Sequence, residues 1–209
     1  MPDDPGHGRP ADAGEAATDQ KEYERLAKLN KVYLAIISRY KDHIEEKERI
    51  SVAELPILVM PKGPMVVKRI EEIKAALGSY SYDQHFYEAS VMAFSFVRDR
   101  IEDAVLPLQF WLTPEDTLTF MIGDLMDKSI LLCSLLIGLG NPSCKVLTCT
   151  RAGLQRTMVY CEFQGRTHSY DFAVGMSAFD SVEGLRKSFL VGDEASAYEF
   201  NDKMYLDLV

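Results

Sequence analysis

The spacing of apolar residues changes once along this chain, near residue 142, and that change limits the folds available to it. Before it, apolar side chains recur every three or four residues, which is typical of helices that bury one face. After it they alternate with polar ones, which is typical of strands. Three strands are predicted, with a tight hairpin at Gln164-Gly165-Arg166 between the last two: Ser143–Thr150, Thr157–Phe163 and Thr167–Ala173. Helices followed by an antiparallel meander predict an α+β fold rather than a doubly wound one.

Helices are predicted ahead of the strands. The first covers residues 21–47 and carries an apolar stripe that includes Leu26, Tyr33 and Ile37. This stripe can pack within the chain or pair with another copy, so a homodimer through residues 21–47 is one alternative. The remaining helical segments run from about Val66 to Leu77, Gln84 to Asp103 and Met126 to Leu139.

The formal net charge of −9 is distributed unevenly along the 209 residues. Residues 1–20 hold five acidic residues against one cation, Arg9, and they contain no Val, Ile, Leu or aromatic residue. Such a segment buries too little apolar surface to fold, so we expect a disordered acidic tail over residues 1–20. Nucleic acids and anionic membranes both attract clustered Lys and Arg. We therefore expect neither nucleic acid nor a membrane as a partner of this acidic chain.

The cysteines lie in apolar or strand-like segments, at Cys133, Cys144, Cys149 and Cys161. The sequence has no C-x-x-C motif and no apolar export signal near its start, so we expect free, buried thiols in a cytoplasmic protein. The cysteine spacing fits no zinc site, and glycine-rich phosphate or dinucleotide loops are absent from the sequence. Neither a metal nor another cofactor is expected.

One stretch of the sequence is distinctive. It begins Trp111-Leu112-Thr113-Pro114-Glu115-Asp116-Thr117-Leu118 and continues as Gly123-Asp124-Leu125-Met126-Asp127-Lys128-Ser129 into a leucine-rich segment. This resembles the transglutaminase-like superfamily, especially its microbial, cysteine-protease-like branch, over roughly residues 84–175. In that family a tryptophan-containing segment precedes a G-D-C block at the start of a helix, and later strands carry a histidine and an aspartate. The resemblance implies a papain-like core, with an antiparallel sheet packed on a central helix.

The resemblance also implies where a catalytic triad should lie. The family's nucleophilic cysteine, activated by the N-terminus of its helix, corresponds to Leu125. The histidine corresponds to Met158, or to Thr157 if the strand register shifts by one residue. The third position is retained as Asp171. Leucine cannot attack a carbonyl, and neither methionine nor threonine can act as the base, so two of the three groups are missing.

A rearranged active site is the alternative. Its candidate base is His168, although the odd separation of His168 from Asp171 on one strand points the two side chains to opposite faces. Cys133 lies among leucines and is expected to be a core residue. The candidate nucleophiles are Ser129, which lies one helical turn after the Leu125 position, and Thr157, Cys144 and Cys161. With such a site the chain would be an active cysteine-protease-like or transglutaminase-like hydrolase or acyl-transferase.

Overall, the residues favour a catalytically inactive domain that binds a protein or peptide, or that serves as a scaffold. We expect the acidic tail over residues 1–20, a helical extension over 21–80 and a transglutaminase-like domain over 81–209. The family's groove lies between the helix N-terminus and the sheet, and here it would be apolar. Its expected lining is Leu125, Met158, Tyr160 and Asp171, with Trp111 at the rim.

Overall fold

The computed structural model describes residues 13–47, 51–104 and 110–209, with side chains described from Tyr23 to Asp42 in the first range. Contacts divide the chain into two compact units, Met1–Glu48 and Arg49–Val209. This division differs from the predicted boundary at residue 80, because the helices that follow Arg49 pack into the core of the second unit. Residues 1–12 of the predicted acidic tail lie outside the described residues.

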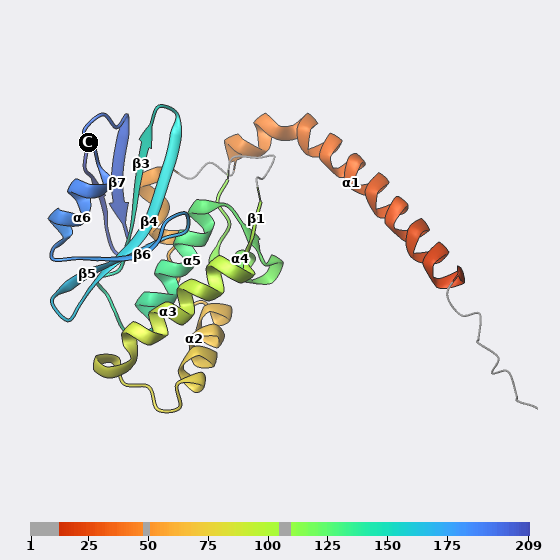
Figure 1. Cartoon of the computed structure of the whole chain (residues 1–209). Helices are drawn as coiled ribbons and strands as arrows, with labels where there is room; N and C mark the ends of the chain where they lie inside the picture. The colour runs from red at the N-terminus through yellow and green to blue at the C-terminus, as the bar shows by residue number, and fades with distance from the viewer. Residues whose placement is uncertain (1–12, 48–50, 105–109) are drawn as a thin grey trace, which may run out of the picture. The chain divides into compact units, whose positions relative to one another are not determined.

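The described part of the first unit is one long helix, α1 (Ala13–Lys47) (Figure 1). Residues 13–20, predicted to be disordered, are helical, which corrects the predicted start at residue 21. Their alanines, Glu15 and Gln20 favour helix, and extending an existing helix costs far less than starting one. Apolar side chains in the described part of α1 are exposed, among them Leu26, Tyr33 and Ile36.

The second unit begins with a layer of helices. These are η1 (Val52–Leu58), α2 (Pro64–Ala76), α3 (Tyr82–Arg100), α4 (Pro114–Phe120) and α5 (Leu125–Gly138). The central helix is α5, which packs against α2, α3, α4 and the sheet and is buried around most of its circumference. An apolar helix needs such cover on all sides. No described helix combines the length and low polarity that crossing a bilayer requires.

In the described residues, six strands form an antiparallel sheet in the order β6-β5-β4-β3-β7-β8. The strands are β3 (Lys145–Arg151), β4 (Leu154–Phe163), β5 (Arg166–Asp171), β6 (Gly175–Phe179), β7 (Ser196–Phe200) and β8 (Tyr205–Asp207). The three predicted strands are present as β3, β4 and β5. Gln164 and Gly165 form the predicted hairpin with φ angles of 49° and 75°, as a two-residue turn of this kind requires. The predicted α+β architecture is confirmed.

Other elements complete the second unit. α6 (Val182–Phe189) follows β6. A short parallel pair, β1 (Glu102–Asp103) and β2 (Ile122–Gly123), lies beside the start of α5 and was not predicted. The edge strand β6 was also not predicted.

Both faces of the sheet are buried. Val159 and Cys161 of β4 point toward the helical layer and belong to the main core. Met158 and Tyr160 point to the opposite face and form a smaller cluster with α6. Because both faces are covered, β4 is buried without interruption from Thr157 to Cys161.

Candidate functional site

The N-terminus of α5 is built by two aspartates that cap each other. Asp124 Oδ1 accepts the backbone N–H of Asp127 at 2.9 Å, and Asp127 Oδ2 accepts the backbone N–H of Asp124 at 3.0 Å. This reciprocal capping box begins the helix at Leu125, whose side chain is half-buried. Leu125, which the resemblance aligns with the family nucleophile, occupies the first position of this helix, one residue before the predicted start at about Met126.

Asp127 also holds the preceding segment in place. Its Oδ1 accepts the backbone N–H of Leu112 at 2.8 Å, which fixes the chain directly after the half-buried Trp111. The carboxylate is almost completely buried, and burial together with the charge of Asp124 raises the pKa of Asp127 to about 6. Both of its oxygens accept hydrogen bonds, so Asp127 acts as a structural tie between two segments.

Lys128 makes the third polar contact of this region. Its Nζ donates to Asp103 Oδ1 at 2.6 Å and so links α5 to the short strand β1. The Lys128 side chain is buried, whereas the Asp103 side chain is exposed to solvent. The ion pair therefore joins a buried cation to a carboxylate at the protein surface. The aliphatic stem of Lys128 packs inside the fold while the ammonium reaches a partner at the surface.

The two hydroxyl candidates, Ser129 and Thr157, are both engaged in hydrogen bonds. Ser129 Oγ donates to the backbone carbonyl of Leu125 at 2.7 Å. Thr157 Oγ1 lies 3.1 Å from Thr148 Oγ1 across the β3–β4 pair, and both threonines are buried. Neither hydroxyl has a described histidine or carboxylate as hydrogen-bond partner.

The structure does not bring Leu125, Met158 and Asp171 together. Leu125 begins α5, on the helical side of the sheet, whereas Met158 belongs to the cluster on the α6 side. Asp171 lines a hollow on that α6 side together with Met158. Side chains alternate along a strand, so the β4 position that faces the helical layer is the neighbouring Thr157, the alternative register considered above.

The remaining predicted groove residues are also separated. Tyr160 lies on the α6 side and Trp111 packs against the main core. The expected groove, with Leu125, Met158, Tyr160 and Asp171 on one surface, is therefore not formed. A shift of one residue on β4 moves the histidine position to the helical side, but it leaves Asp171 of β5 on the α6 side.

Asp171 has a local structural role. Its Oδ1 accepts the backbone N–H groups of Ala173 and Val174 at 2.8 and 3.1 Å, which closes the turn between β5 and β6. The nearest cation is Arg156, whose Nη2 lies 3.9 Å from Asp171 Oδ2. An aspartate that bonds the backbone two and three residues later is a common turn former.

His168 lies on the opposite sheet face from Asp171, as its sequence position predicts. Its ring packs on Tyr87 with centroids 5.3 Å apart, and burial lowers the pKa of His168. His168 is the cross-strand partner of Cys161, the candidate nucleophile. The Cys161 thiol is completely buried, and its Sγ lies 3.8 Å from the hydroxyl of Tyr170.

The cysteines are free and buried, as predicted. Burial raises the pKa of the Cys133 and Cys144 thiols, which keeps them protonated and unreactive at neutral pH. Among the described residues no group of three or more His, Cys, Asp or Glu side chains is placed to hold a metal ion.

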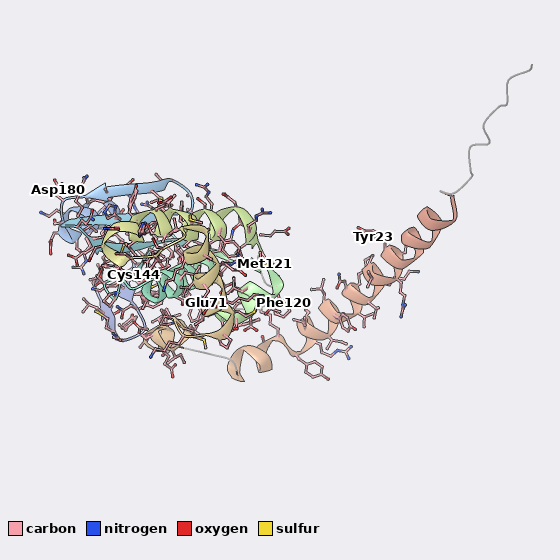
Figure 2. The ribbon with its side chains drawn as sticks, turned by 90° about the horizontal axis from the view of Figure 1, so that it is seen from below. Tyr23, Glu71, Phe120, Met121, Cys144 and Asp180 are labelled. Atoms are coloured by element: carbon pink, nitrogen blue, oxygen red, sulfur yellow. The ribbon has the colours of Figure 1, made fainter. Side chains whose placement is uncertain are left out.

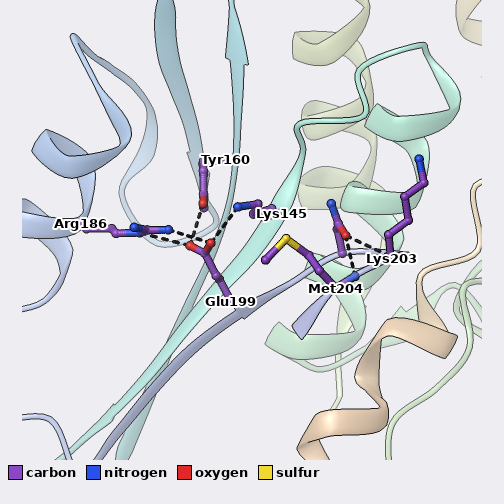
Figure 3. A network of polar contacts seen from close by, with 7 residues as sticks. Lys145, Tyr160, Arg186, Glu199, Lys203 and Met204 are labelled. Carbon is purple, nitrogen blue, oxygen red and sulfur yellow. Dashed lines mark hydrogen bonds and ion pairs between the residues drawn. The ribbon is translucent and has the colours of Figure 1, made fainter. Parts of the chain in front are cut away.

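A buried carboxylate that sequence reasoning missed organises the α6 side of the sheet. Glu199 of β7 is completely buried, and its two oxygens accept from Lys145 Nζ at 2.8 Å, Arg186 Nη2 at 2.7 Å and Tyr160 Oη at 2.7 Å (Figure 3). Burial favours the neutral acid, but these donors outweigh it and lower the pKa of Glu199. The signal in the sequence is a glutamate between aromatic residues in a short strand, Tyr198-Glu199-Phe200.

No protein-family model and no curated protein matches the chain significantly. Among solved structures, LapG from Legionella pneumophila is similar at 12% identity over 68% of this chain and 87% of that chain, with a TM-score of 0.43. Its calcium-bound form is 13% identical over 66% and 87% of the two chains, with the same TM-score of 0.43. A proposed cysteine protease from Cytophaga hutchinsonii is 14% identical over 77% of this chain and 55% of that chain, with a TM-score of 0.44.

Proposed function

We propose that this chain is a catalytically inactive member of the transglutaminase-like superfamily that acts as a binding module for a protein or peptide partner. The observation that carries the proposal is the N-terminus of α5, where the hydrocarbon side chain of Leu125 stands at the positive end of the helix. A cytoplasmic location is part of the proposal and is supported by the free, buried cysteines.

The candidate hydroxyl groups of Ser129 and Thr157 support this proposal because each has a structural partner. The Ser129 hydroxyl donates its proton within α5, and the Thr157 hydroxyl pairs with Thr148. Attack on a carbonyl requires a nucleophile whose proton is taken by an adjacent base, and no described base contacts either hydroxyl.

The alternative is an active enzyme with a rearranged site, and one pair of residues supports it. Cys161 and His168 are cross-strand partners and so lie on the same face of the sheet. Against it, Cys161 has no exposed surface, so a substrate carbonyl cannot reach its sulfur in this conformation. His168 packs its ring against Tyr87 and Phe163.

Labelling of the native chain tests the proposal. We expect no stoichiometric reaction with iodoacetamide or with a serine-directed fluorophosphonate at neutral pH, and no hydrolysis or glutamine transfer on peptide substrates. The unfolded chain is the control, since iodoacetamide should then modify all 4 cysteines. Labelling of a single residue in the native chain, together with turnover, would overturn the proposal and favour the rearranged site.

A second copy of the chain is the partner proposed for α1. Its stripe of exposed apolar side chains is available for pairing, and the helix is basic in its middle and acidic toward both ends. A staggered pair of copies would place the acidic end of one helix against the basic middle of the other, which adds favourable charge pairing to apolar burial. The basic middle contains Arg25, Lys28, Lys31, Arg39 and Lys41.

Charge introduced into the stripe should therefore separate the copies. We expect Ile36→Glu to convert a dimer into a monomer, measured by sedimentation equilibrium, because a buried unpaired carboxylate is costly. The matched control is Ala35→Glu, which adds the same charge on the polar side of α1 and should leave the dimer intact. A native chain that sediments as a monomer throughout the micromolar range would contradict this assignment.

A further inference from the structure

The two edges of the sheet are not equivalent. One edge is β8, which is three residues long and lies against η1. The other is β6, five residues long, which pairs with β5 on one side and has no strand on its other side in the described part of the chain. An edge strand presents main-chain N–H and C=O groups that can pair with an added strand.

The sequence of β6 does not protect this edge. Natural edge strands are commonly guarded by lysine, by proline or by an inward-pointing charge. The sequence of β6 is Gly-Met-Ser-Ala-Phe, which contains none of these, and Ser177 and Ala178 in its middle are exposed. The Asp180 side chain directly after β6 lies at the end of the unit remote from Phe120 and Met121 (Figure 2).

A hollow borders β6 on each face of the sheet. The larger, of about 470 Å³, is lined on the α3 side by Tyr87, Phe163, His168 and Met176. The smaller, of about 120 Å³, is on the α6 side and is lined by Leu185, Phe189 and other apolar side chains. Because successive side chains of a strand point to opposite faces, a strand added to β6 would place neighbouring side chains alternately in the two hollows.

Each hollow also has one arginine with a weak partner. Arg166 lines the α3-side hollow, and its Nη2 lies 3.9 Å from the fully exposed carboxylate of Asp180. Arg156 lines the α6-side hollow at the same distance from Asp171, whose other oxygen already closes a turn. Both ion pairs are long and both arginine side chains are about half exposed, so each guanidinium group can also serve an acidic ligand.

We propose that β6 binds an extended acidic peptide as an added strand, with its apolar side chains in the two hollows and its carboxylates near Arg156 and Arg166. The proposal rests on the proposed function, because it identifies the surface that a peptide partner of the binding module would use. Main-chain hydrogen bonds to β6 supply the affinity, and the hollows and arginines supply the selectivity.

The probe is a fluorescein-labelled peptide with a central Val-Phe-Val sequence between two runs of glutamates, titrated into the full chain by fluorescence anisotropy. We expect it to bind, and we expect its lysine-flanked counterpart to bind at least about tenfold more weakly. Two N-methylated versions test the main chain, one methylated at odd positions and one at even positions. Only one set of N–H groups faces β6, so one version should lose binding and the other should keep it.

Protein variants locate the site. Ser177→Glu adds a like charge in the middle of β6, and we expect it to weaken binding of the glutamate peptide by at least about tenfold. The matched control is Leu206→Glu, which places the same charge at the other edge of the sheet and should leave binding unchanged. Circular dichroism and urea unfolding should show both variants folded, since both side chains are exposed.

The results separate this proposal from the proposed function. Absence of binding at millimolar peptide, equal binding of both N-methylated versions, or equal effects of the two glutamate variants would each overturn the β6 site while leaving the inactive module untouched. Cleavage of the bound peptide would instead overturn the proposal of inactivity and leave the β6 site standing.

Discussion

Replacing Glu199 with alanine should lower the free energy of unfolding by about 3–5 kcal/mol, the usual cost of removing one member of a buried charge network. Glu199 is completely buried, and it accepts from Lys145, Arg186 and Tyr160 (Figure 3). Without the carboxylate, two cations lose the anion that compensates their partial burial. The loss should be measurable as a shift in urea midpoint at constant slope.

The same contribution should depend on pH. The folded-state pKa of Glu199 is lowered because the three donors outweigh the effect of burial. The stabilisation is therefore fully present above the pKa of an unfolded glutamate and is lost as pH falls through the folded-state pKa. The stability difference between the native chain and Glu199→Ala should be large at pH 7 and shrink in acid.

Two variants control this result. Glu183→Ala removes an exposed acid from α6 and should change stability by less than about 0.5 kcal/mol. Glu199→Gln keeps the shape of the side chain and should lose most of the pH dependence. If Glu199→Ala and Glu183→Ala unfolded at the same urea concentration, the network would have no part in fastening α6 to the sheet.

Leu125→Cys should change the number of reactive thiols in the native chain from none to one. The native cysteines are buried, whereas position 125 is half-buried at the start of α5. A thiolate there is stabilised by the positive end of the helix, and the opposing charge of Asp124 is partly satisfied by the Asp127 N–H. Mass spectrometry after iodoacetamide treatment counts the labelled sites directly.

A matched cysteine distinguishes activation from simple exposure. Leu154→Cys places a thiol at the exposed first residue of β4, away from any helix end, and its pKa should lie near that of free cysteine, about 8.5. The rate of labelling against pH should show a lower pKa for Leu125→Cys than for Leu154→Cys. The reverse order would show that the α5 N-terminus does not lower the pKa of a thiol at position 125.

The start of α5 could be predicted from sequence because its determinants are local. Asp124 and Asp127 form a capping box within four residues, and a leucine-rich run follows directly. The hairpin at Gln164-Gly165 is likewise encoded in the two residues that form it.

The candidate groove could not be predicted because its geometry depends on which sheet face each β4 residue occupies. Alternation of apolar and polar residues shows which side chains face the core only when the other face of the sheet is exposed to solvent. In this sheet α5 covers one face and α6 covers the other. Five consecutive residues from Thr157 to Cys161 are buried, so the pattern could not separate Thr157 from Met158. β6 could not be predicted from sequence for a related reason. Its residues show no alternation of apolar and polar side chains, and none of them is β-branched.

The position of β7 between β3 and β8 affects how the chain folds while it is being synthesised. β3 is synthesised well before β7, so one edge of β3 stays open while β4, β5, β6 and α6 emerge from the ribosome. During that interval Lys145, Tyr160 and Arg186 lack the carboxylate that joins them, because Glu199 belongs to β7. The sheet can close only late in translation, and a nascent chain stalled before β7 would present an open strand edge to chaperones and proteases.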